Sequence, residues 1–175
     1  KHLIGMPHWQ YVNITDPSQG LQKNHSLINC FNGEYFELQI GKTDPKAGKL
    51  AFDCLSKAVT DLKDNKIDAL VTAPISKDNI QSKDFNFPGH TEYLAQVFEK
   101  KNVLMFMVSD SLRIGVVTGH VPLEKVKQNL SKEKIRSKLN IMLNTLKIDF
   151  GIPKPKIAVL GLNPHAGENR SEEHT

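Results

Sequence analysis

The chain has 175 residues, of which 39% are hydrophobic and 24% are charged, a composition typical of one globular domain with its own core. No segment approaches the run of about 18 apolar residues that a membrane-spanning helix needs. The N-terminal residues also lack the apolar core of a signal peptide. Taken together, these features exclude an integral membrane protein and a fibrous one.

The formal net charge of +4 raises the question of nucleic-acid binding, but the lysines are dispersed. The densest basic stretch, residues 125–138, interleaves glutamates and apolar residues at helical spacing, which is typical of a solvated helix face. Interleaved aromatic residues and Gly-rich RNA-binding patterns are absent from the sequence. We therefore expect no nucleic-acid partner.

Two cysteines, Cys30 and Cys54, are far apart in the sequence and form no CxxC motif. Cys54 falls on the expected apolar face of a helix. We expect two reduced, partly buried thiols in a cytoplasmic protein.

The first third of the chain contains one clear helix. Residues 1–30 are polar and are expected to be irregular, and residues 36–40 alternate as a short strand does. From Ala47 to Leu62, apolar residues recur at steps of three and four, which predicts an amphipathic helix that ends near residues 63–65.

In the middle of the chain, an apolar run at residues 69–74 ends in a proline and predicts a buried strand. Thr91 is expected to cap a helix over residues 92–98. Further strands are predicted within residues 103–108 and 113–118.

The last third of the chain begins with Pro122, which is expected to open a short helix. Ser131 should cap a longer helix, and Gly151 should end it. Residues 156–162 form a final apolar run that predicts another strand. Because helices alternate with buried strands, the sequence predicts a layered α/β fold with a largely parallel sheet, in which ligands bind beyond the carboxyl ends of the strands.

Polar clusters follow three of the predicted strands, and a fourth opens a helix. The clusters lie at residues 72–77, 118–120, 163–168 and 89–92. His120 and His165 each follow an apolar run, and imidazole is a common ligand of divalent transition metals. Two histidines alone make a weak metal site, and a single loop histidine is more often an ordinary surface residue.

His90 and Thr91 stand at a predicted helix N-terminus, where free N–H groups and the helix dipole favour a phosphate or a carboxylate. The alternative is that Thr91 only caps the helix and His90 is merely exposed. Lys77 follows a strand end and a proline turn. It can supply positive charge or carry a proton, or it can be an ordinary surface lysine.

Four blocks of sequence carry a resemblance to a known family. They are Ala-Leu-Val-Thr-Ala-Pro-Ile-Ser-Lys at residues 69–77, Phe-Pro-Gly-His-Thr-Glu at 87–92, Val-Thr-Gly-His-Val-Pro-Leu at 117–123 and Gly-Leu-Asn-Pro-His-Ala-Gly-Glu at 161–168. In order and approximate spacing, this set resembles the 4-hydroxythreonine-4-phosphate dehydrogenases of vitamin B6 synthesis. The resemblance runs from about residue 33 to residue 168.

The resemblance implies an α/β/α sandwich like that of the isocitrate and isopropylmalate dehydrogenases, here truncated at both ends, in a cytoplasmic homodimer. It implies NAD-dependent oxidation of a small phosphorylated hydroxy acid, followed by loss of CO2, with the help of a divalent cation (Zn, Mg or Co). Carried over by motif, His120 and His165 would bind the metal, His90 and Thr91 would contact the substrate, and Lys77 would be catalytic. The NAD-binding residues are unknown, because the family's later sequence is absent.

The resemblance also indicates an incomplete enzyme. The third metal-binding histidine of the family lies in sequence beyond Glu168, so we expect residues 1–169 to be an incomplete dehydrogenase domain that is inactive alone. Residues 170–175 read Arg-Ser-Glu-Glu-His-Thr, which is what a common sequencing-adapter read encodes when translated. We expect this tail to be non-native.

Three other functions stay open at the level of sequence. A relative within the family could oxidise a threonate or erythronate phosphate. A metal-dependent hydrolase would use the same two histidines, although the sequence has no HExxH motif. A non-catalytic nucleic-acid-binding domain would show binding that weakens steeply with salt.

Overall fold

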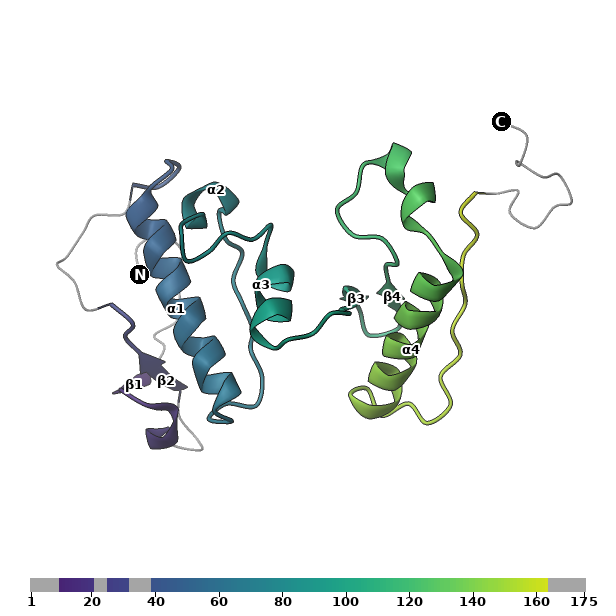
Figure 1. The fold of residues 1–175 in the computed structure, drawn as a ribbon. Helices are drawn as coiled ribbons and strands as arrows, with labels where there is room; N and C mark the ends of the chain where they lie inside the picture. The colour runs from purple at the N-terminus through teal and green to yellow at the C-terminus, as the bar shows by residue number, and fades with distance from the viewer. Residues whose placement is uncertain (1–9, 21–24, 32–38, 164–175) are drawn as a thin grey trace, which may run out of the picture. The chain divides into compact units, whose positions relative to one another are not determined.

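The computed structural model describes residues 10–20, 25–31 and 39–163, which belong to two compact units that divide after Lys101 (Figure 1). The first unit contains β1 (Tyr11–Ile14), η1 (Pro17–Gln19), β2 (His25–Ile28), α1 (Pro45–Lys63), α2 (Lys77–Ile80) and α3 (His90–Val97). The second contains β3 (Phe106–Val108), β4 (Arg113–Gly115), η2 (Leu123–Lys125), η3 (Lys127–Asn129) and α4 (Lys132–Ile148). No helix within these described residues is both long and apolar enough to cross a membrane.

The structure confirms the predicted amphipathic helix. This helix, α1, begins at Pro45, two residues before the predicted start at Ala47. The Asp44 carboxylate caps it by accepting a hydrogen bond of 2.9 Å from the backbone N–H of Lys46, and Pro45 takes the first helical position. The helix ends where Asn65 adopts the left-handed conformation, with φ of 55°.

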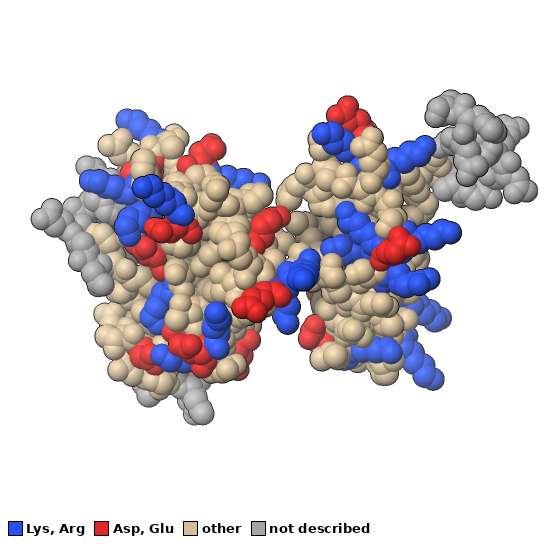
Figure 2. All heavy atoms as spheres, viewed as in Figure 1, with Lys and Arg blue, Asp and Glu red and all other residues tan. Residues whose placement is uncertain are grey.

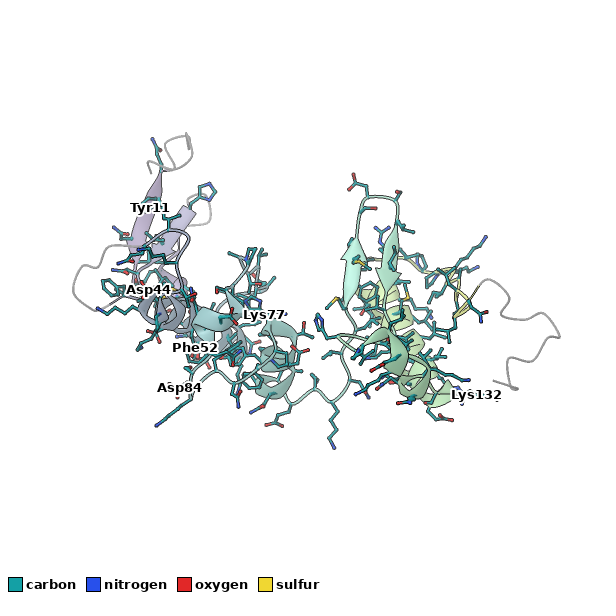
Figure 3. All side chains as sticks on the ribbon, turned by 90° about the horizontal axis from the view of Figure 1, so that it is seen from above. Tyr11, Asp44, Phe52, Lys77, Asp84 and Lys132 are labelled. Atoms are coloured by element: carbon teal, nitrogen blue, oxygen red, sulfur yellow. The ribbon has the colours of Figure 1, made fainter. Side chains whose placement is uncertain are left out.

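The core of the first unit is an aromatic and aliphatic cluster between α1, α2 and α3. Leu55 and Val59 of α1 pack with Ile80 of α2, with Tyr93 of α3 and with Phe85, whose side chain is 0% exposed. Phe52 and Phe87 each make edge-to-face contacts with Phe85 and Tyr93 at centroid distances of 5.4–5.9 Å. The rings of Phe85 and Tyr93 are tilted against each other at 5.3 Å. Figure 3 labels Phe52 among these side chains. This cluster fixes α3 against α1.

A parallel pair, β1 and β2, lies beside α1. Tyr11 pairs with His25 and Ile14 with Ile28, and the ammonium of Lys66, just beyond α1, lies 2.7 Å from the carboxylate of Asp16. The expectation that residues 1–30 are irregular is therefore wrong at these positions. The two segments are exposed along most of their length, and their exposed positions include apolar as well as polar residues, so their period-two pattern is weak.

In the second unit, β3 and β4 form an antiparallel hairpin in which Phe106 pairs with Gly115. As the sequence predicts, Ser131 caps α4 through its hydroxyl, which accepts a hydrogen bond of 3.1 Å from the N–H of Lys134. The chain leaves α4 through Gly151, whose φ of +63° suits a glycine at a helix end.

The predicted parallel sheet is wrong for the described residues. Their strands make two separate two-stranded sheets, the parallel β1–β2 and the antiparallel β3–β4. Residues 69–74 and 156–162 have no regular secondary structure, and Ile40 stands in a turn, while residues 36–38 lie outside the described parts. An apolar run becomes a strand only when a neighbouring backbone completes its hydrogen bonds. The mixture of helices and strands itself agrees with the predicted α/β class.

Candidate functional site

A cavity of about 260 Å³ lies in the first unit where residues 70–75 pass α1 and the start of α3. Its wall is formed by four residues of α1, the loop before α2 and one histidine: Ala51, Cys54, Leu55, Ala58, residues 70–75 and His90. Thr72 and His90 belong to two different polar clusters of the sequence. The fold therefore brings two of the four predicted clusters to one small cavity.

The α1 wall of this cavity was not predicted as part of a site. Ala51, Cys54 and Ala58 recur at helical spacing, and the sequence assigns them to the apolar face of a core helix. Their side chains are small, so α1 leaves free volume where larger residues would fill the gap. The helical spacing of these small residues is the only signal in the sequence that could have indicated this wall.

His90 is held in place by the residues that precede it. The ring of Phe87 packs at 5.4 Å from that of Phe85, and the side-chain amide of Gln81 donates a hydrogen bond of 2.8 Å to the carbonyl of Phe87. These contacts fix the loop that leads into α3, which places His90 at the first position of the helix.

The predicted capping of α3 by Thr91 is wrong. The helix begins at His90, two residues earlier than expected, with Gly89 as its N-cap and no side-chain hydrogen bond to the first turn. Thr91 is half-buried in that turn and is not part of the cavity wall. Glu92 also stands in the first turn and already places a negative charge near the positive end of the helix dipole.

Lys77 is the first residue of α2 and is exposed (Figure 3). Ser76 caps this short helix by accepting a hydrogen bond of 3.4 Å from the N–H of Asn79. The cavity wall includes Ile75 but not Lys77. The structure thus places Lys77 close in sequence to the cavity and outside its lining.

The structure describes only one of the two histidines that are predicted to bind a metal. His120 is exposed in the segment between β4 and η2 of the second unit, and His165 lies outside the described residues. Among residues 10–20, 25–31 and 39–163, no three or more His, Cys, Asp or Glu side chains gather as a metal site would require. The residues present therefore do not complete a metal centre, and metal binding stays a prediction.

The second unit contains an apolar cavity of about 540 Å³ between β4, α4 and residues 156–160. The guanidinium of Arg113 stacks on the ring of Phe150 at 4.8 Å, and its buried Nε has no hydrogen-bond partner among the described residues. Lys138 donates a hydrogen bond to the carbonyl of Val103, and burial, with a smaller effect of Lys134, lowers its pKa. This part of the second unit is therefore a packed apolar region, with the basic side chains of Arg113 and Lys138 at its edge.

Charges of both signs are interspersed on the face of the first unit that Figure 2 shows. One ion pair of this unit is nearly buried: the ammonium of Lys57 lies 2.5 Å and 2.6 Å from the two carboxylate oxygens of Asp61, which is 3% exposed. Among the described residues on this face, no single-sign patch of the kind that binds nucleic acid is seen.

Helices and short strands, with a small cavity lined mainly by apolar residues and also by Thr72 and His90, define part of a mixed α/β protein. The sequence profile of one family, described as pyridoxal phosphate biosynthetic protein PdxA, matches residues 2–174. The chain belongs to this family.

Individual relatives agree with this assignment. The 4-hydroxythreonine-4-phosphate dehydrogenase of Bacteroides thetaiotaomicron is 44% identical over 144 residues, which cover 82% of this chain and 39% of that protein. A Salmonella typhi protein with the provisional name D-threonate 4-phosphate dehydrogenase is 36% identical over 132 residues, covering 75% of this chain and 40% of that protein.

A solved structure from Salmonella typhimurium, provisionally described as a 4-hydroxythreonine-4-phosphate dehydrogenase, matches with a TM-score of 0.80 and 30% sequence identity. The match covers 94% of this chain and 51% of that chain. The chain thus spans about half the length of the proteins that it resembles. The predicted family is confirmed, whereas the arrangement of the whole α/β/α sandwich is not tested by this part.

Proposed function

We propose that the chain is part of an NAD-dependent 4-hydroxythreonine-4-phosphate dehydrogenase that acts in the synthesis of pyridoxal 5'-phosphate. The single observation that carries the proposal is the cavity that residues 70–75 and His90 line together. The name of the Bacteroides relative supports the substrate, a phosphorylated hydroxy acid.

The residues of this chain would bind and orient the substrate. The imidazole of His90 can donate a hydrogen bond to a phosphate or carboxylate oxygen, and the hydroxyl of Thr72, which lines the same cavity, can donate another. Thr91, in the same helical turn as His90, is proposed to contact a substrate that extends beyond the cavity. Holding the substrate in one orientation is a large part of what an enzyme contributes to such a reaction.

The remaining groups of the site are proposed from the family. Lys77 would act from α2 on a substrate that reaches past the cavity wall, as a source of positive charge or a proton carrier. His120 and His165 would supply two ligands of a divalent cation (Zn, Mg or Co), and further ligands would come from outside this chain. When bound, NAD would supply the hydride acceptor and the cation would supply a Lewis acid.

The whole protein is proposed to be a cytoplasmic homodimer with no nucleic-acid partner. A second substrate, D-threonate 4-phosphate, is favoured by the name of the Salmonella typhi relative. Assays of NAD reduction with each substrate on the full-length protein would separate the two. The 175-residue chain itself is proposed to form no NADH with either substrate, because the described residues bring no three candidate metal ligands together.

Substrate binding can be tested on this chain by NMR of its histidine rings. Titration with 4-phosphooxy-threonine should shift the ring signals of His90 and leave those of His25 unchanged, and the substitution His90→Gln should remove the response. His25 is a suitable control because it lies in β2 of the same unit and outside the cavity. Equal shifts at both histidines, or none at His90, would refute the proposed substrate site.

A further inference from the structure

Two cysteines that are far apart in the sequence meet in the first unit. Cys30 follows β2, and Cys54 lies in the middle of α1. Cys30 lines a cavity of about 630 Å³ together with Asp53 and Lys57 of α1, and Asp53 is the residue next to Cys54. The fold therefore places the end of β2 against the part of α1 that carries Cys54.

The surroundings of the two thiols favour their protonated forms. The S–H of Cys30 donates to the carbonyl of Ile28 at a sulfur–oxygen distance of 3.9 Å. Burial raises the pKa of the Cys54 thiol, and the nearby thiol of Cys30 raises it further.

Neither thiol is sealed from solvent. Cys54 is exposed and Cys30 is half-buried, and each lines an open cavity. A small oxidant can therefore reach the pair. The raised pKa of Cys54 means that its thiolate is scarce at neutral pH, so the first step should be slow.

We propose that Cys30 and Cys54 are a redox modification site, at which a small-molecule disulfide oxidises the two thiols to one intramolecular disulfide. In the first step, the thiolate of one cysteine attacks the external disulfide, and one small thiol leaves. The second cysteine loses its proton and attacks the protein sulfur of that mixed disulfide, and the second small thiol leaves. Two protein thiols are oxidised, and one external disulfide is reduced to two thiols.

The bond would tie the end of β2 to α1 at the wall of the candidate substrate cavity, because Cys54 lines that cavity as well. Its formation does not depend on the proposed function. In a reducing compartment, the two thiols stay reduced until the concentration of small-molecule disulfides rises. The fraction of chains that contain the disulfide would therefore change with the redox conditions.

The test uses the 175-residue chain with oxidised glutathione, followed by an acid quench and alkylation of the remaining thiols with N-ethylmaleimide. Mass spectrometry should find a monomer that has lost two hydrogen atoms and resists alkylation, with the peptides of Cys30 and Cys54 joined. This species should exceed the glutathione adduct by about tenfold, since the neighbouring thiol is present at high effective concentration. A reductant should reverse the change.

Single variants and a denaturant provide the controls. Cys30→Ser and Cys54→Ser should each stop at the adduct with one glutathione. In denaturant, the wild-type ratio of internal disulfide to adduct should fall, because the fold no longer holds the thiols together. A native wild type that accumulates only glutathione adducts or linked dimers, or a ratio unchanged by denaturant, would overturn the proposal.

Discussion

Gly48 of α1 packs directly against the backbone of Asn79 in α2. A Cβ atom at position 48 would stand 1.7 Å from the carbonyl oxygen of Asn79, a distance that no real contact allows. The side chain of Asn79 also accepts a hydrogen bond of 3.1 Å from the N–H of Asp44, the residue that caps α1. The two helices are thus locked at one point, just beyond the loop that lines the candidate cavity.

The substitution Gly48→Ala should lower the free energy of unfolding by about 3 kcal/mol, because the added methyl group forces α2 away from α1. Denaturant titration followed by circular dichroism measures the change. Gly119→Ala is the matched control, since a Cβ there meets no atom within 4 Å. Equal stability of the two variants would contradict the close packing of α1 and α2.

Two lysine–aspartate pairs with the same spacing on α1 should differ in their contribution to stability. Lys57→Met leaves the buried carboxylate of Asp61 unpaired and should cost about 3 kcal/mol. Lys49→Met breaks the pair with Asp53, in which the lysine is largely exposed, and should cost about 0.5 kcal/mol or less. Similar losses in the two variants, measured by denaturant titration, would show that Asp61 is hydrated.

Asp16 should titrate at an unusually low pH. The hydrogen bond from Lys66 and those from Ser18 hold the pKa of its carboxyl well below the ordinary value of 3.8. The carboxyl of Asp16 therefore has a lower pKa in the folded chain than in the unfolded chain. Its ionised form stabilises the fold fully at pH values above the unfolded-state pKa, and this stabilisation is lost as the pH falls through the folded-state pKa. Lys66 behaves in the opposite way, because Asp16 raises the pKa of the Lys66 ammonium. The contribution of Lys66 to the stability of the fold is therefore lost at alkaline pH.

The measurement is an NMR titration of the Asp16 carboxyl carbon. Lys66→Ala should raise the pKa of Asp16 without restoring the ordinary value, because the Ser18 hydroxyl and N–H still donate to it. Lys63→Ala, at an exposed position at the end of α1, should leave it unchanged. The ion-pair assignment fails if the two variants titrate alike.

Phe85 should be the most sensitive position of the first unit. Phe85→Ala removes a fully buried ring that contacts Phe52, Phe87 and Tyr93, and should cost about 4 kcal/mol. Val71→Ala, at a side chain that is 95% exposed, should change stability by about 0.5 kcal/mol or less. Thermal unfolding compares them, and a small loss at Phe85 would contradict the tight packing of this aromatic core.

The helices could be predicted from the sequence because their signals are local. The cap at Ser131, the proline at position 45 and the apolar spacing of residues 47–62 act within one or two turns. The apolar runs at residues 69–74 and 156–162 have the composition of strands. A strand also needs a neighbouring strand to complete its backbone hydrogen bonds, and local propensity does not reveal whether one is present. Parallel pairing of β1 with β2 was missed for the same reason.

The candidate site could be predicted only in part. His90 and the polar cluster that begins at Thr72 were predicted because polar residues after apolar runs are unusual, although residues 69–74 were expected to be a strand. The wall of α1 had only the helical spacing of its small residues as a signal, and the approach of Cys30 to α1 depends on tertiary packing. Capping of α3 by Thr91 failed because a glycine and a threonine are both acceptable N-caps, and the choice between them depends on the preceding loop.

Among the described residues, the core of the first unit and the hydrophobic side chains packed against it come from residues 52–98. Contacts of such short sequence separation form quickly. During synthesis, this core should be able to close while the ribosome is still adding the later half of the protein. The growing chain would then contain a folded core onto which the later segments pack. The apolar side chains of this core would be buried, and so inaccessible to chaperones, before translation ends.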